Sequence, residues 1–407
     1  MTLTRPVASL PPGSAGLTPL AWLRKNLFSS WFNGILTLLL GALLLHSLMR
    51  FSQWAWGVAQ WGVIPTNLPL FFVGRFPTDQ YWRLWLLLTL LTLMAGLTWG
   101  VLAHLSSRLF GPGPLVGLAV AALTVIILPI AGDQALLVKL KLLGLLGLLT
   151  VTAWLGHGWG QQRPGLGRWL ALGWSLMFLV GLWLVIGGLG LPMVASTAWG
   201  GLLLTALMSL VSIVLSFPIG VLLALGRQSP LPVIRLLSSF YIEVVRGVPL
   251  ITVLFIGLIM VPLFLPGNWR LDVVFRTILG LTLFTAAYLA ETIRGGLQAI
   301  PKGQYEAASS LGLNTPLSLG LIILPQALKI SIPAIVGLFI SLLQDTTLVS
   351  IVGLFDLLGI SRSILANPLF IGRYGEVYLF IGVLYWLLCY AMSQGSRYLE
   401  RQLHTSH

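Results

Sequence analysis

The side chains best able to do chemistry in this sequence are ionisable residues inside or beside long apolar segments. In the second half of the 407-residue chain these include the acids Glu243, Glu291 and Asp345. A charged group at membrane depth is costly, so such residues face a partner, water or the protein interior. Arg246 and Arg294 each follow a glutamate by three residues, which places each acid and base on one helical face.

These acids and bases have two interpretations. They are either local ion pairs near a membrane surface, each contributing about 0.2–0.5 kcal/mol in exposed helices, or parts of a pathway. We favour structural or gating roles over direct contact with a substrate. Asp345 and the hydroxyl of Thr346 could accept a substrate ammonium, although a structural hydrogen-bonded turn is the interpretation that we favour. Pro249, like Pro218, can kink a helix that flanks a pathway.

Arrangements typical of enzymes are missing from the sequence. There is no G-x-x-x-x-G-K-[ST] phosphate-binding loop, and no cluster of metal ligands or nucleophile beside a base stands out. The single cysteine, Cys389, excludes a disulfide within one chain. We therefore expect a chain that is not an enzyme and binds no cofactor or metal itself.

The composition indicates a membrane protein. Hydrophobic residues make up 57% of the chain and charged residues only 8%, whereas soluble domains carry about 25% charged residues. The net charge of +13 does not indicate nucleic-acid binding, because the 23 Lys and Arg are scattered singly at the edges of apolar runs. That distribution is typical of topology signals and contacts with lipid headgroups.

The hydropathy pattern predicts an all-α integral membrane protein, a polytopic bundle of about ten transmembrane helices. A span needs roughly 20 apolar residues. With the N-terminus inside, fourteen basic residues fall in cytoplasmic segments and nine outside, which agrees with the positive-inside rule and places both termini in the cytoplasm. The candidate spans are 31–49, 84–103, 114–132, 137–156, 169–190, 197–225, 247–265, 273–293, 326–344 and 376–396.

Polar residues divide the chain near residue 192. Upstream segments are rich in Leu and Trp, whereas downstream segments contain or border ionisable residues. We therefore expect an N-terminal cytoplasmic tail (1–30), accessory transmembrane helices (31–192) and a transport domain (193–400). Within the accessory part, Lys139 and Lys141 lie just inside the candidate span 137–156.

A polar loop at 301–325 lies between two of the downstream spans. Residues 304–311 are rich in helix formers and end at Gly312, a natural C-cap. Thr315 and Pro316 then suit the start of a second helix, which we expect Pro325 to end or kink. The loop is either an ordinary amphipathic connector or a low-profile surface that inserts into a groove of another protein.

Seven residues of this loop form a spaced pattern: Glu306, Ala307, Ala308, Gly312, Ile322, Leu324 and Pro325. The pattern resembles the EAA motif of the inner-membrane permeases of bacterial binding-protein-dependent ABC importers. The resemblance implies a type I importer transmembrane domain that works by alternating access and docks a separate ATPase, which binds ATP and Mg²⁺. It also implies a second permease subunit and a periplasmic amino-acid-binding protein as partners.

Other segments narrow the resemblance to permeases for polar L-amino acids of the histidine/glutamine type, in the bacterial inner membrane. Residues 25–40 and 74–83 resemble the longer permease of general L-amino-acid systems, although 104–168 looks like an added hairpin. The alternative is an ion-coupled secondary amino-acid transporter, in which the loop is only a connector. The four downstream segments that resemble the polar-amino-acid permeases are 197–227, 241–255, 286–308 and 345–359.

Overall fold

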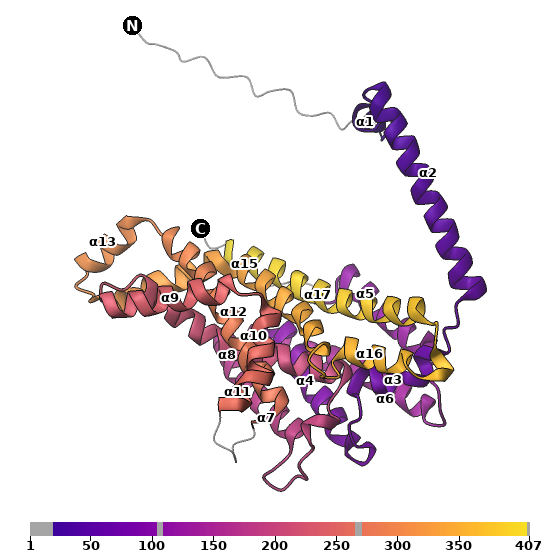
Figure 1. The fold of residues 1–407 in the computed structure, drawn as a ribbon. Coiled ribbons are helices and arrows are strands. Elements are labelled where there is room, and N and C mark those ends of the chain that lie inside the picture. Colours follow the sequence, from indigo (N-terminus) through magenta and orange to yellow (C-terminus); the bar gives the residue numbers. More distant parts are fainter. Residues whose placement is uncertain (1–18, 104–108, 265–270, 405–407) are drawn as a thin grey trace. The chain divides into compact units, whose positions relative to one another are not determined.

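The computed structural model describes residues 19–103, 109–264 and 271–404, and the regular secondary structure of these residues is entirely helical (Figure 1). The chain divides into two compact units, Met1–Gln60 and Trp61–His407. Of the predicted tail, residues 1–18 lie outside the described residues. The predicted domain boundary near residue 192 stays a prediction.

The first unit consists of a short helix and a long apolar helix. The short helix, α1 (Pro19–Asn26), falls within the predicted tail. The hydroxyl of Ser30 caps α2 (Trp31–Gln53) by accepting from the Asn33 N–H. A π-helical turn, Trp54–Val58, extends α2 to a candidate span of 28 residues. No residue of α2 is buried, as suits a helix surrounded by lipid.

Seven further candidate spans lie in the second unit, so eight helices among the described residues are long and apolar enough to cross a membrane. A ninth is formed if the bent pair α9 (Pro232–Gly247) and α10–α11 (Leu250–Phe255 and Val261–Phe264) counts as one span. The described part of the chain is therefore an all-helical polytopic membrane protein. The seven are built on α4 (Tyr81–Leu102), α6 (Ala135–Gln162), α7 (Gly167–Ile186), α8 (Gly201–Arg227), α12 (Val273–Gln298), α15 (Leu324–Asp345) and α17 (Tyr374–His404).

The predicted count of about ten spans differs from this result at two places, and each has a local cause. The candidate 114–132 corresponds to α5 (Pro112–Ile127), which has only 16 residues, because Pro129 disfavours helical backbone in the residue before it. The candidate 247–265 is part of the bent pair, whose two helices meet at an angle of 104° across Val248 and Pro249.

Close backbone contact joins α4 to α6. A Cβ added at Gly100 would lie 2.1 Å from the Ala153 carbonyl oxygen, and one at Gly156 would lie 2.8 Å from that of Leu97. Only glycine allows the two backbones to approach so closely. In addition, α7 packs against α4, and the Trp174 indole N–H donates to the Thr98 hydroxyl at 3.0 Å.

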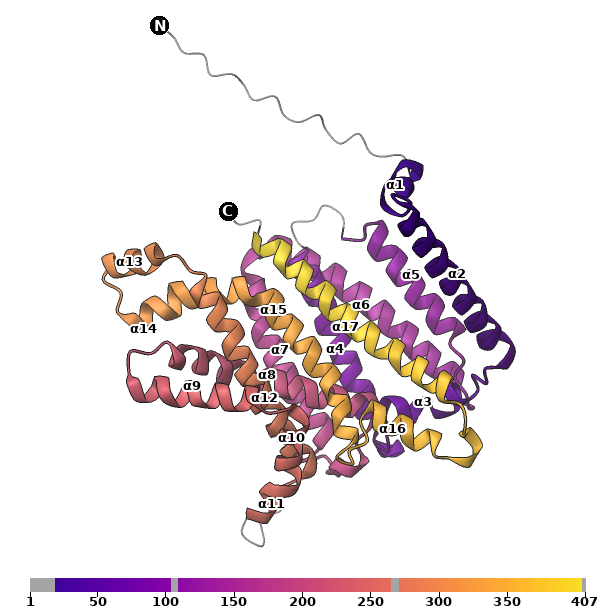
Figure 2. The same ribbon diagram turned by 45° about the horizontal axis from the view of Figure 1, so that its top comes forward.

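The centre of the second unit is α12, which packs against α8 on one side and α15 on the other (Figure 2). α17 packs on α15, and the short helices α3 (Val63–Val73) and α16 (Leu357–Leu365) pack against each other and α8. The short helices α13 (Lys302–Ser310) and α14 (Thr315–Ser318) lie at the opposite end of the unit from α3 and α16 (Figure 2).

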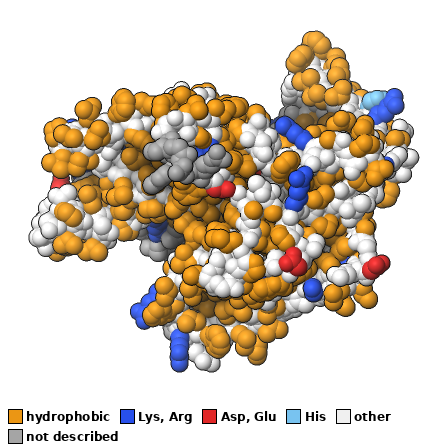
Figure 3. All heavy atoms as spheres, turned by 60° about the horizontal axis from the view of Figure 1, so that its bottom comes forward, with side chains coloured by type: hydrophobic (Ala, Val, Ile, Leu, Met, Phe, Trp, Pro, Cys, Tyr) orange, Lys and Arg blue, Asp and Glu red, His pale blue; other side chains and the backbone are white. Residues whose placement is uncertain are grey.

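Hydrophobic side chains cover most of the face shown in Figure 3, and charged groups appear there only in isolated places. Such a surface matches a bilayer as the surrounding solvent, because lipid-facing positions carry few charges. The structure therefore confirms the membrane class indicated by the composition.

Candidate functional site

The loop at 301–325 forms a helical hairpin made of α13, a glycine turn and α14. On α13, Glu306 and Ala307 are exposed, whereas Ala308 is buried with 1% exposure. Part of the exposed surface is low in profile, because Ala307, Ser309 and Ser310 are exposed and have short side chains. At the turn, Leu311 is 76% exposed, and the sequence analysis did not single out this apolar residue.

Gly312 ends α13 in a left-handed conformation with φ +74°. The N–H of Leu313 donates to the Ala308 carbonyl and the N–H of Gly312 to that of Ser309, at 3.2 and 3.0 Å. This pair of bonds is the Schellman motif, in which glycine is favoured because it has no Cβ penalty in the left-handed region. The predicted C-cap is confirmed.

The second helix starts and continues differently from the prediction. Asn314, rather than Thr315, is the N-cap, because its Oδ1 accepts from the Leu317 N–H at 3.1 Å. Pro325 does not end the helix. A π-helical segment, Leu319–Ile323, leads directly into α15, with Pro325 in the first turn of α15, where proline needs no backbone donor.

A buried apolar cluster joins this hairpin to the ends of the nearby spans. Tyr305 of α13 and Ile323 of the π segment pack in it with residues of α8, α9, α12 and α15. The Gln326 amide also donates to the Gln304 side chain at 3.2 Å, which links α15 to α13. The hairpin is therefore packed against the spans as one body. Fully or nearly buried members are Ala224, Ile242, Leu289, Ala290, Ile293, Leu297, Ile300, Ile323, Ala327 and Ile335.

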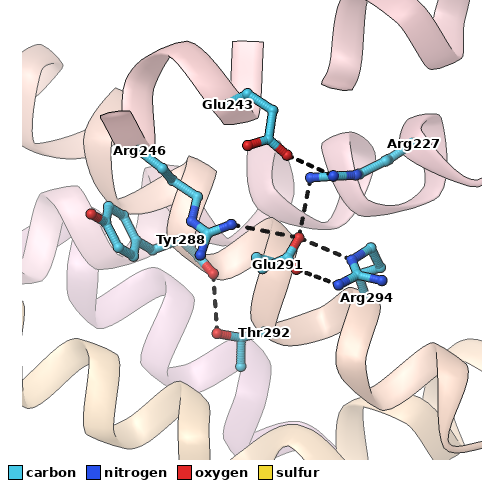
Figure 4. A network of polar contacts seen from close by, with 7 residues as sticks. All are labelled: Arg227, Glu243, Arg246, Tyr288, Glu291, Thr292 and Arg294. Carbon is cyan, nitrogen blue, oxygen red and sulfur yellow. Dashed lines mark hydrogen bonds and ion pairs between the residues drawn. The ribbon is translucent and has the colours of Figure 1, made fainter. Parts of the chain in front are cut away.

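Close to this cluster, ionisable side chains from α8, α9 and α12 form one network (Figure 4). The Glu291 carboxylate accepts from Arg227 at 3.2 Å and from the Nε of Arg294 at 2.9 Å. It also makes a second contact with Arg294 and an ion pair with Arg246 at 3.8 Å. Arg227 pairs in addition with Glu243 at 2.7 Å. Glu291 is therefore the acid on which all three arginines converge.

The network differs in part from the two local pairs considered in the sequence analysis. Glu291 and Arg294 do pair along α12, but the partner of Glu243 is Arg227 of α8 rather than Arg246. Arg246 instead lies over the Tyr288 ring, with its guanidinium carbon 5.4 Å from the ring centroid. The sequence analysis did not identify Arg227 or Tyr288 as members of the network. The only feature of the sequence that pointed to either of them was the position of Arg227 at the end of an apolar helix.

The remaining predicted residues lie elsewhere. Pro249 marks the 104° bend between α9 and α10. Asp345 ends α15 and is half-buried. Thr346 is fully buried, and its hydroxyl donates to the Leu343 carbonyl at 2.7 Å. Thr346 therefore has a structural hydrogen bond in this conformation, and neither residue belongs to the network around Glu291.

Comparison with known proteins adds an independent observation to this geometry. The family described as the binding-protein-dependent transport system inner membrane component matches residues 216–405. The inner membrane amino-acid ABC transporter permease protein YhdY of Escherichia coli is 35% identical over 424 residues, with 99% of each chain covered. The glutamate/glutamine/aspartate/asparagine transport system permease protein BztC of Rhodobacter capsulatus is 38% identical over 447 residues, covering 99% of this chain and 98% of that protein.

Among solved structures, the crystal structure of an amino acid ABC transporter with histidines is 31% identical, with a TM-score of 0.44, and covers 49% of this chain and 90% of that chain. The fold and the full-length relatives together define a multi-pass component of an inner-membrane transport system. The chain belongs to the family of amino-acid ABC transporter permeases, which are the non-catalytic transmembrane components of binding-protein-dependent systems. The resemblance stated from the sequence is confirmed.

Proposed function

We propose that this permease imports polar L-amino acids by alternating access, driven by a separate ATPase that docks on residues 306–325. The observation that carries the proposal is the capped hairpin of α13 and α14, with the buried cluster that packs it against α8, α9, α12 and α15. Because packed helices move as rigid bodies, a displacement of the hairpin would move the ends of these spans together.

The surface offered to the ATPase would be the exposed side of the hairpin. Glu306 and Ala307 are exposed on α13, and Leu311 and Leu317 expose 76% and 48% of their surface. Small residues with a few apolar side chains suit insertion into a groove of a partner protein. Leu324 and Pro325, at the start of α15, would transmit the movement, and ATP and Mg²⁺ would bind to the partner.

The network around Glu291 would act as a gate between conformations. It joins three helices by ion pairs whose side chains are partly exposed, so water can replace each contact when the helices separate. Pro249, at the bend, would allow α9 to move relative to α10. Neither feature requires contact with the substrate.

The substrate class follows from the family and from the full-length relatives, one of which is named for glutamate, glutamine, aspartate and asparagine. Transport would also need a periplasmic binding protein and a second permease subunit that completes the pathway. Asp345, half-buried at the end of α15, is a candidate acceptor for the ammonium of an amino acid, with a structural role as the alternative.

Reconstitution into liposomes tests the source of energy. The permease, its second subunit, the ATPase and the binding protein are reconstituted, and uptake of labelled glutamate and glutamine is measured with and without ATP inside. We expect uptake only with ATP and binding protein. Uptake that persists without ATP and follows an imposed proton or sodium gradient would support the secondary transporter instead.

A pair of glycine variants tests the coupling role of the hairpin. Gly312→Val forces a β-branched residue into left-handed backbone, which costs about 1–2 kcal/mol or more, and should abolish uptake while the chain remains inserted. Gly303→Val is the control, because Gly303 lies in α13 without positive φ and a Cβ there meets nothing within 4 Å. Normal ATPase co-purification and uptake with Gly312→Val would refute the coupling role.

A further inference from the structure

Two lysines lie within the first two turns of α6, where the surrounding residues are apolar. Lys139 and Lys141 are the fifth and seventh residues of this 28-residue helix. Neither takes part in an ion pair in the described part of the chain, which contains all ten acidic residues of the sequence. Unpaired ammonium groups in a transmembrane helix are rare and usually have a function.

The ammonium group of Lys139 has a structural partner. Its Nζ donates to the carbonyl of Ile126 at 2.7 Å, in the last turn of α5. A cation at the C-terminal end of a helix also interacts favourably with the helix dipole. Lys139 therefore links α5 to α6 by a hydrogen bond.

Lys141 has a different environment. Its side chain is exposed, and its ammonium nitrogen lies 4.9 Å from the centroid of the Trp85 ring of α4. Beside it, α4 and α6 enclose a groove with a volume of 310 Å³. Lys141 and Trp85 lie together at one end of the lining, and Gly144, Leu145 and Leu148 continue from them along α6. The lining residues are Trp85, Thr89, Lys141, Gly144, Leu145 and Leu148.

The groove lies at the end of the spans away from the hairpin. Arg83, in the first turn of α4, donates to the Pro192 carbonyl in the connection that leads into α8. α8 then runs for 27 residues to Arg227, in the network near the hairpin. If the hairpin is cytoplasmic, Lys141 lies near the outer surface, where the positive-inside rule disfavours lysine.

We propose that the groove between α4 and α6 binds one acidic phospholipid, with its phosphate at Lys141 and an acyl chain along Gly144, Leu145 and Leu148. The unpaired ammonium supplies the complementary charge for a phosphodiester. Trp85 adds an amphipathic ring of the kind that is enriched at headgroup depth. Gly144 is exposed and a Cβ there meets nothing within 4 Å, so the floor of the groove is open to an acyl chain.

Native mass spectrometry of the purified transporter complex tests this site. Phosphatidylglycerol and phosphatidylcholine with the same acyl chains are titrated in a neutral detergent, and the bound fraction is measured for each variant. Lys141→Gln should weaken phosphatidylglycerol binding about fivefold, which corresponds to roughly 1 kcal/mol for one basic residue. Lys141→Arg should retain binding, and phosphatidylcholine should bind weakly to every variant.

Two matched controls separate the site from general effects of charge and bulk. Arg168→Gln also removes one exposed cation near an indole, that of Trp169, and should leave lipid binding unchanged. Gly144→Leu should fill the groove and weaken binding, whereas Gly147→Leu should not, because Gly147 has equal space but does not line the groove. This second pair keeps Lys141 intact, so it tests the site even if Lys141→Gln fails to fold.

Three results would overturn the proposal. The first is equal phosphatidylglycerol binding by the wild type, Lys141→Gln and Gly144→Leu. The second is equal affinity for phosphatidylcholine, which would leave no role for the charge. The third is complete competition by millimolar inorganic phosphate, which would assign Lys141 to a free anion rather than to a lipid.

Discussion

Glu291 is the residue that links the ends of three helices through ion pairs. Its carboxylate contacts Arg227 of α8, Arg246 of α9 and Arg294 of α12. Its side chain is 23% exposed, whereas that of Glu243 is 61% exposed and forms an ion pair with Arg227 alone among the described residues. The two glutamates therefore differ in both the number of partners and solvent screening.

This difference predicts unequal effects of the same substitution. Glu291→Gln leaves three partly buried arginines without their shared acceptor and should destabilise the permease by about 1–3 kcal/mol, with loss of ATP-coupled uptake. Glu243→Gln removes one exposed ion pair and should cost less than about 1 kcal/mol. Thermal unfolding in detergent and uptake in liposomes measure both, and equal behaviour of the two variants would exclude Glu291 as the centre of the network.

Asp356 is a buried acid that the sequence analysis did not identify. It is the N-cap of α16, where its carboxylate accepts from the N–H groups of Leu358 and Gly359 at 3.1 and 2.9 Å. Burial raises the pKa of Asp356 to about 6, although the two backbone donors and Arg362 act in the opposite direction. The sequence position after an apolar run gave no sign of this burial.

The raised pKa of Asp356 predicts a dependence of stability on pH. The folded protein holds this proton up to about pH 6, whereas the unfolded chain loses it near 3.8, so stability falls as pH rises through this window. Between pH 5 and 7 the wild type should lose about 1 kcal/mol relative to Asp356→Asn, which keeps a capping oxygen and does not titrate. Thermal unfolding of both proteins at the two pH values measures the difference, and parallel pH profiles would contradict it.

At the scale of elements, local chemistry predicted the first half of the hairpin well. Gly312 ends α13 as expected, because a left-handed C-cap depends on neighbouring backbone alone. The start of the second helix was harder to predict, because Asn314 and Thr315 are both favourable N-cap residues. Only the observed bond from the Leu317 N–H to Asn314 distinguishes them. The π segment before Pro325 depends on packing that no short motif specifies.

The contact between α12 and α15 provides a test at the same scale. A Cβ at Gly296 would lie 2.1 Å from the Ser331 hydroxyl oxygen and 2.5 Å from the Ala327 carbonyl oxygen, whereas one at Gly295 meets nothing within 4 Å. Gly296→Ala should therefore destabilise by about 1–3 kcal/mol through overpacking. Gly295→Ala should be neutral or stabilise by up to about 1 kcal/mol. If the two variants had the same unfolding midpoint, the close contact at Gly296 would be refuted.

For the molecule as a whole, apolar length predicted where helices occur but not how many of them cross the membrane. Each of the ten candidate ranges corresponds to a helix, yet α5 is short and α9 bends away from α10. The network was not predictable either, because Arg227 and Glu291 are 64 positions apart. Pairing over such a distance follows from helix packing, and hydropathy carries no information about it.

The predicted topology, with both termini in the cytoplasm, can be tested on the whole chain. If α5 and the bent pair each complete a crossing, the number of crossings is ten, and the C-terminus lies on the same side as the N-terminus. A fluorescent protein fused to either end should then fluoresce, and alkaline phosphatase fused at the same positions should be inactive. An active phosphatase at one end only would show an odd number of crossings.

The spacing of the two glutamates along the chain also has a consequence for biogenesis. Glu243 follows Arg227 by 16 residues, whereas Glu291 follows it by 64. At about 5–20 residues per second, the ribosome needs roughly 3 to 13 seconds to add those 64 residues. Until Glu291 is added, Glu243 is the only acid of this network that Arg227 can meet, so pairing of α8 with α9 does not have to wait for α12. A chain that stalls before Glu291 would leave an incomplete bundle with excess positive charge, a recognisable substrate for membrane quality control.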